Sequence, residues 1–311
     1  MRNNNNKLVI KLVAGAISWS CILPAVWATT PRPLNDNGFV SCRTNTDTAN
    51  CTAVAVDSGS HPRQDARFGR DAANAKGTLS KIGAGRAGFD FTKIAHNGTE
   101  LPANTAYGPD GTPLSDTAWA CTRDNVTGLI WEIKRDDVAQ GSDGLQHHNH
   151  TYSWYSDASH SDGTSGAMNG GNAGVRNGGS CFNKYDLETN PTGNYCDTAG
   201  YVAAINAIHL CGYTDWRLPT PDELLSLVDF SKAGLIPAAP GRRAIDEDYF
   251  PHTLPVKFLS ATTVAGFIRK PDHTSGNEYV WDVNFWYGRN NYPTPTLKSE
   301  NNYVRLVRGT P

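Results

Sequence analysis

The first 28 residues have the pattern of an export signal, and export sets the redox environment in which the rest of the chain folds. Arg2, Lys7 and Lys11 give this segment a cationic start, and a mostly apolar stretch follows from 12 to 26. Small residues then occupy the positions that signal peptidase recognises, so we expect cleavage after Ala28. An uncleaved membrane anchor is the alternative, but the stretch is short for a membrane span. We expect no span after cleavage.

Six of the seven cysteines follow this segment, and an even number in an exported chain predicts disulfides. The clearest pair flanks a short Thr/Asn-rich segment that can turn easily. Zinc ligation is the alternative, but the sequence has no CxxC pair. The pairs that we expect are Cys42–Cys51, Cys181–Cys196 and Cys121–Cys211.

The composition is that of a folded protein that does not bind nucleic acid. The chain is 39% hydrophobic and has eight tryptophans, which excludes a disordered polymer. Its net charge is −2, and loss of the cationic signal makes the remainder more acidic. A generally basic nucleic-acid binder is therefore excluded.

The distribution of tryptophan divides the exported chain into two parts near residue 118. The part from 29 to 118 has none and is rich in Gly, Asn, Thr and Pro, so we expect an irregular, β-rich, disulfide-pinned module there. Every tryptophan after the signal lies within 119–311, where we place the main core.

Hydrophobic periodicity predicts the elements of this second part. Alternation predicts half-buried strands over 128–134 and 279–287, and a third strand over 303–307. In the first strand Glu132 and Lys134 lie on the face opposite to Leu129, Trp131 and Ile133.

Two helices are predicted from their capping residues. The first is capped by Asp197 or Thr198, carries apolar residues at helical spacing as far as Ile208, and ends near 211–212. The second starts at Thr220, which forms a capping box with Glu223. We therefore expect Glu223 to be structural, not catalytic.

A long polar loop from 141 to 180 contains the candidate metal ligands His147, His148 and His150. Neutral imidazoles that are close in sequence can converge on one ion. The alternative is that they are solvated loop side chains. The acidic run 157–163 lacks the residue order of a calcium loop. No feature supports calcium, and we expect no cofactor.

A series of motifs in the second part resembles one known family. The strongest are RDNVTGLIWE at 123–132 and CGYTDWRLPT at 211–220. The motifs that follow in the same order are Glu223-Leu224, Leu259–Thr262, Trp281–Phe285 and Val304–Arg308. Over 119–309 the chain resembles the Lcl C-terminal domain family, long described as a domain of unknown function.

This resemblance implies an α+β, C-type-lectin-like fold that is distantly similar to formylglycine-generating enzymes. In such folds the first and last strands pair, two helices flank a small, mainly antiparallel sheet, and long loops carry the ligand contacts. The chain lacks the collagen repeats of the adhesin that gives the family its name. It also has no cysteine after Cys211, whereas the related oxidases need an active-site pair. We therefore do not expect an enzyme.

The namesake adhesin binds sulfated glycosaminoglycans, so the resemblance implies adhesin-like recognition of extracellular glycans or polyanionic polysaccharides. The alternative is a structural or assembly component of the bacterial envelope that binds a protein partner. The expected location is the periplasm, the outer surface or the medium. The oligomeric state is left open.

Two sets of side chains are candidates for the ligand site. Basic groups would bind a polyanion through charge-assisted hydrogen bonds, and aromatic and amide groups would bind a neutral sugar. The basic set is Arg269, Lys270, Arg289 and Lys298. The aromatic and amide set, with its flanking arginine, is Trp286, Tyr287, Arg289, Asn290, Asn291 and Tyr292. Scattered solubilising charges and a Trp286 buried beneath the long loop are the alternatives.

Overall fold

The computed structural model describes most of the chain after residue 33. The described residues are 34–43, 48–49, 51, 64–108, 115–136, 145–156, 173–181, 196–233, 242–264, 278–290 and 295–309. The predicted signal segment lies outside them. They form an α+β structure with helices, two antiparallel sheets and a small hairpin, which confirms the predicted class. Within these residues no helix has the length and apolar character needed to cross a membrane.

The described chain begins with a small disulfide-closed hairpin. β1 (Cys42–Arg43) pairs antiparallel with β2 (Thr48–Ala49), and the Cys42–Cys51 disulfide closes the turn. A 3-10 turn, η2 (Asp65–Arg67), and the helix α1 (Gly69–Ala75) follow. Ala66 of η2 packs on the disulfide, so the covalent link replaces most of a local core.

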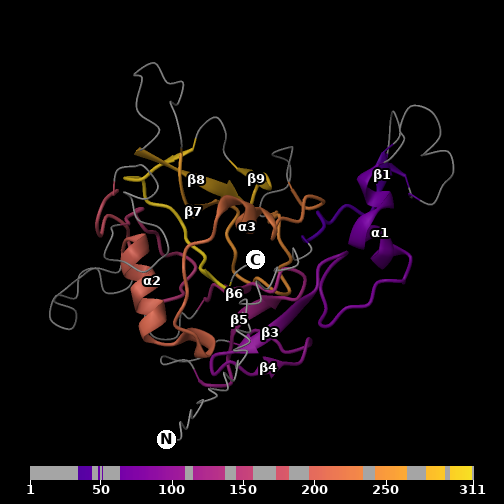
Figure 1. Cartoon of the computed structure of the whole chain (residues 1–311), viewed down its shortest axis with the longest axis horizontal. Helices are drawn as coiled ribbons and strands as arrows, with labels where there is room; N and C mark the ends of the chain where they lie inside the picture. Colours follow the sequence, from indigo (N-terminus) through magenta and orange to yellow (C-terminus); the bar gives the residue numbers. More distant parts are fainter. Residues whose placement is uncertain are drawn as a thin grey trace, which may run out of the picture. The chain divides into compact units, whose positions relative to one another are not determined.

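The larger sheet includes strands from both sides of residue 118. Its order is β11-β6-β5-β3-β4, with antiparallel neighbours throughout, and the four strands from β6 to β4 are labelled in Figure 1. Its strands are β3 (Phe91–Ala95), β4 (Glu100–Leu101), β5 (Trp119–Asp124), β6 (Ile130–Glu132) and β11 (Val307–Arg308). Every residue of β3 has a partner in β5, so the sheet continues across the boundary that the sequence suggested. The last strand, β11, pairs with β6, the first strand predicted after that boundary.

The second sheet is built around β8 (Figure 1). β8 (Tyr279–Asn284) pairs antiparallel with β7 (Lys257–Thr263), β9 (Arg289–Asn290) and β10 (Thr296–Leu297). The sequence suggested a half-buried strand here, but Val280 and Asp282, on the face that was expected to be solvated, are both 0% exposed.

Strand β6 likewise corrects the prediction of a half-buried strand over 128–134. Leu129 and Trp131 belong to one hydrophobic cluster, and Ile130 belongs to another. Glu132 and Lys134 are 0% and 3% exposed. The alternation in the sequence therefore separates two interiors rather than an interior and a solvated face.

Helix α2 (Thr198–Ala207) starts where the sequence predicted. The carboxylate of Asp197, its N-cap, accepts a hydrogen bond from Gly200 N at 2.8 Å. Val202 and Ile205 are buried, but Ile208, after the last turn, is 40% exposed. A 3-10 turn, η4 (Leu210–Gly212), ends this region.

Helix α3 (Pro221–Leu225) begins with the predicted capping box. Glu223 N donates to Thr220 Oγ1 at 3.2 Å, and Thr220 N donates to Glu223 Oε2 at 2.8 Å. The same carboxylate accepts two hydrogen bonds from the Arg217 guanidinium, at 2.6 and 2.8 Å. Glu223 therefore has the structural role that the sequence predicted.

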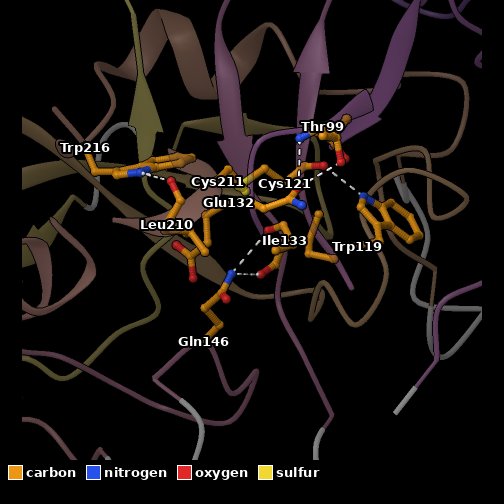
Figure 2. The surroundings of a disulfide bond; sticks show 12 residues. Thr99, Trp119, Cys121, Glu132, Ile133, Gln146, Leu210, Cys211 and Trp216 are labelled. Carbon is orange, nitrogen blue, oxygen red and sulfur yellow. Dashed lines mark hydrogen bonds between the residues drawn. A yellow bond between two sulfur atoms is a disulfide. The ribbon is translucent and has the colours of Figure 1, made fainter. Parts of the chain in front are cut away.

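The three disulfides are the three predicted pairs. Cys121 of β5 is joined to Cys211 of η4, 90 residues later. Figure 2 shows two tryptophans beside this bond: Trp216 Nε1 donates to Leu210 O at 3.0 Å, and Trp119 Nε1 donates to Cys121 O at 2.9 Å. The disulfide thus ties the larger sheet to the segment that follows α2.

Candidate functional site

The turn between β8 and β9 brings three of the predicted ligand residues together. The ring centroids of Trp286 and Tyr287 are 6.4 Å apart, and the Arg289 guanidinium carbon lies 5.4 Å from the Tyr287 ring. Tyr287 is 45% exposed, Arg289 is exposed and Trp286 is half-buried. We call these three residues the hairpin patch.

Local hydrogen bonds hold the backbone of the hairpin patch. Asn284 Oδ1 accepts from Trp286 N, and Asn284 O accepts from Gly288 N, both at 2.8 Å. Gly288 has a φ of 63°, and a Cβ there would lie 2.9 Å from Val228 Cγ1. Glycine is therefore required both by the turn and by its close packing on Val228.

Of the other predicted ligand residues, only Lys298 has a described side chain. Asn290 lies in β9, but its side chain is outside the described part. Residues that lie wholly outside it are Arg269, Lys270, Asn291 and Tyr292.

Lys298 is not the surface cation that the sequence suggested. It is 2% exposed, and its Nζ lies 4.1 Å from the centroid of the Trp154 ring. Burial lowers its pKa to about 8. It lines a small cavity of about 260 Å³ with Val175 and Glu278. A buried amine of this kind is unsuited to exposed polyanion binding.

A larger cavity of about 820 Å³ was not predicted at all. Its walls come from several parts of the chain, and the residues that define its chemistry are Arg86, Lys93, Tyr107, Trp119, Asp246 and Tyr249. Lys93 Nζ lies 4.2 Å from the ring centroid of Trp119 and 5.2 Å from that of Tyr249, and burial lowers its pKa. Lys93 thus lies over two of the aromatic rings in this cavity, those of Trp119 and Tyr249.

Charges of both signs line the cavity, so it does not favour a polyanion. Asp246 belongs to an acidic run, 246–248, whose composition is typical of a solvated turn. Its side chain is instead buried, and its Oδ2 accepts a hydrogen bond from Arg86 N at 2.8 Å. Burial raises its pKa. Asp246 therefore fixes the 84–86 loop through the backbone of Arg86.

The histidines of the polar loop come together, but with a partner that the sequence did not predict. One nitrogen each of His147 and His148 and one carboxylate oxygen of Asp136 lie within 4.8 Å of one another. His150 is nearby, with a ring centroid 5.2 Å from that of His147. His252 also joins, because its Nδ1 lies 3.9 Å from Asp136 Oδ2. Asp136 precedes His147 by 11 residues and His252 follows His150 by 102, so neither belongs to the histidine-rich stretch that the sequence pointed to.

Comparison with protein families identifies the region that contains the hairpin patch and the histidines. The model of the Lcl C-terminal domain matches residues 120–308, more than half of the chain. The chain belongs to the Lcl C-terminal domain family. No curated protein and no solved structure matches it.

The Lcl C-terminal domain accounts for only part of the features described above. The hairpin patch lies wholly within it, and so does the group formed by Asp136, His147 and His148. The large cavity is also lined by residues from 84 to 107, which precede the match. The segment before the Lcl C-terminal domain therefore adds a strand pair to its sheet and a wall to this cavity.

Proposed function

We propose that the chain is an exported, non-enzymatic binding module that recognises extracellular glycans, above all sulfated or carboxylated polysaccharides, through the hairpin patch. The observation that carries this proposal is the position of Tyr287, which is 45% exposed and flanked by Trp286 and Arg289. Membership of the Lcl C-terminal domain family supports a binding role.

The chemistry of the patch suits a charged sugar. An exposed aromatic ring can pack against the apolar face of a pyranose. A guanidinium beside it can donate two hydrogen bonds to one sulfate or carboxylate. The hairpin patch combines these groups within four residues, and its Tyr287 is 45% exposed, whereas Trp119 and Tyr249 of the large cavity are 5% and 4% exposed.

The described side chains support binding without catalysis. All six described cysteines are in disulfides, so this part of the chain offers no thiol nucleophile. Glu223 is held by its capping box and by Arg217. The disulfides are also consistent with export, and we propose the periplasm, the outer surface or the medium as the location.

A glycan array tests this proposal. We expect the wild-type chain, without its signal segment, to bind sulfated glycans, and to bind less as salt rises from about 0.05 M to about 0.5 M, because salt screens exposed charges. Tyr287→Ala and Arg289→Ala should each abolish the signal. Phe68→Ala and Arg242→Ala alter an exposed aromatic and an exposed arginine elsewhere, and should leave it unchanged.

Two results would overturn the proposal. One is the absence of glycan binding together with stable co-purification of a single envelope protein, unaffected by the patch variants. That result would establish the alternative function, an assembly component of the envelope. The other is glycan binding that both patch variants retain, which would place the site elsewhere.

A further inference from the structure

Asp136, His147 and His148 form the densest group of metal-ligating atoms in the described chain. One ligand atom from each lies within 4.8 Å of the other two. We propose that these three residues bind a late first-row transition-metal ion, for which Zn²⁺ is the reference. This site is independent of the glycan site proposed above.

Backbone hydrogen bonds fix the two histidines beside Asp136. Arg135 N donates to Gln146 O at 3.0 Å, and His148 N donates to Arg135 O at 2.9 Å. Gln146 anchors this contact to the larger sheet, because its Nε2 donates to Ala120 O of β5 at 3.3 Å and to Ile133 O at 3.0 Å (Figure 2). The ligands are therefore positioned by main-chain pairing, which reduces the cost of ordering them around an ion.

The hydrogen bond of His148 suits a ligand. Its Nδ1 lies 3.0 Å from Arg135 O and 3.6 Å from Asp136 Oδ1, and a neutral ring that donates Nδ1–H to the carbonyl carries its lone pair on Nε2, which is then the nitrogen that would bind the ion. Metal-binding histidines commonly make such a bond to a backbone carbonyl. His147 Nδ1 accepts from Asn149 N at 3.2 Å, and a cation bound by this nitrogen would replace that long contact.

The burial of the group allows an ion to enter and then shields it. The side chain of Asp136 is 41% exposed, that of His148 is 16% exposed, and His147 is buried. His252 lies beside the open side, with its Nδ1 3.9 Å from Asp136 Oδ2. Tyr107 steadies this side, since its Oη accepts from Asp136 N at 2.9 Å and its ring packs on His252.

The donor set selects the class of ion. Two imidazoles and one carboxylate are ligands that Zn²⁺ and its neighbours prefer, whereas Ca²⁺ and Mg²⁺ prefer sites made of oxygen atoms alone. Calcium and magnesium should therefore not compete with zinc here.

Calorimetric titration of the untagged, oxidised chain with ZnCl₂ tests the proposal. We expect one Zn²⁺ per chain and a rise in melting temperature on binding, with no competition from CaCl₂ or MgCl₂. Asp136→Asn and His148→Ala should each lower the affinity at least tenfold. His96→Ala is the control and should bind as the wild type does. Circular dichroism and melting of the zinc-free variants verify that they fold.

The variant His150→Ala separates this site from the His147, His148 and His150 cluster that the sequence suggested. We expect it to keep most of the zinc affinity. Loss of binding in His150→Ala with full binding in Asp136→Asn would overturn the proposal. So would a wild-type chain that binds no zinc, or zinc binding that survives combined replacement of Asp136 and His148.

Discussion

Glu132, the last residue of β6, and Lys134, two residues later, form an ion pair inside the protein. Lys134 Nζ lies 2.6 Å from Glu132 Oε1, and the side chains are 4% and 0% exposed respectively. Tyr201 of α2 donates its hydroxyl hydrogen to Glu132 and accepts from Lys134, and Leu306 N donates to Glu132 Oε2. Burial lowers the pKa of Lys134 to about 8. The pair thus connects β6, α2 and the C-terminal segment.

Breaking this pair should destabilise the fold. We expect Lys134→Met and Glu132→Gln each to lower the free energy of unfolding by about 3 kcal/mol, because each leaves a buried group without its partner. The double variant should lose less free energy of unfolding than the sum of the losses in the two single variants. Urea denaturation measures all three, with the exposed Lys76→Met as a control expected within about 0.5 kcal/mol of wild type. Strict additivity would show that the two groups do not interact.

Lys298 should make stability depend on alkaline pH. Its pKa is about 8 in the folded chain against an ordinary value of 10.5, so between these values the unfolded chain binds more protons. The free energy of unfolding should therefore rise with pH relative to that of Lys298→Met, by at most about 1.4 kcal/mol per pH unit. Denaturation of both proteins from pH 7 to pH 10 measures this difference. A constant difference would contradict the prediction.

The capping box of α3 predicts that three substitutions lower the free energy of unfolding by different amounts, which urea denaturation measures. Thr220→Ala should cost about 1 kcal/mol, since it removes the acceptor for Glu223 N. Glu223→Ala should cost about 2 kcal/mol, because it also leaves the Arg217 guanidinium without its carboxylate. Asp222→Ala, an exposed acidic residue in the same turn, should cost less than about 0.5 kcal/mol. Equal losses for all three would show that the box adds nothing specific.

Sequence alone identified those features whose partners are neighbours along the chain. The α3 capping box needs only Thr220 and Glu223, and the Asp197 cap needs only Gly200. The hairpin patch was found for the same reason, since its three residues lie within four positions of the chain. Local spacing determines such contacts before any tertiary packing is known.

Apart from the Cys121–Cys211 disulfide, the features made by tertiary packing were missed. Alternation shows which residues share a face of a strand but not what covers that face, so Glu132 and Lys134 were expected to be solvated. Lys298 was taken for a surface charge because its neighbours in sequence do not indicate that Trp154 packs against it. Asp136 reaches the histidines only through the pairing of Arg135 with His147.

The Cys121–Cys211 and Cys42–Cys51 disulfides close loops of very different length, so they should contribute different amounts to the free energy of unfolding. Replacing Cys121 and Cys211 together by alanine opens a loop of 90 residues and should cost about 4 to 5 kcal/mol. The same change at Cys42 and Cys51, which are nine residues apart, should cost about 2 to 3 kcal/mol. Thermal melts of the two double variants compare them. A larger loss at the Cys42–Cys51 hairpin would contradict the expected order.

The most direct test of the proposed function is a titration of the ¹⁵N-labelled chain with a sulfated oligosaccharide, followed through the indole N–H signals of its tryptophans. We predict that the Trp286 signal shifts in a saturable way, that the Trp119 signal in the large cavity does not, and that Arg289→Ala abolishes the shift. Saturable movement of the Trp119 signal alone, or no movement of any indole signal, would contradict glycan recognition by the hairpin patch.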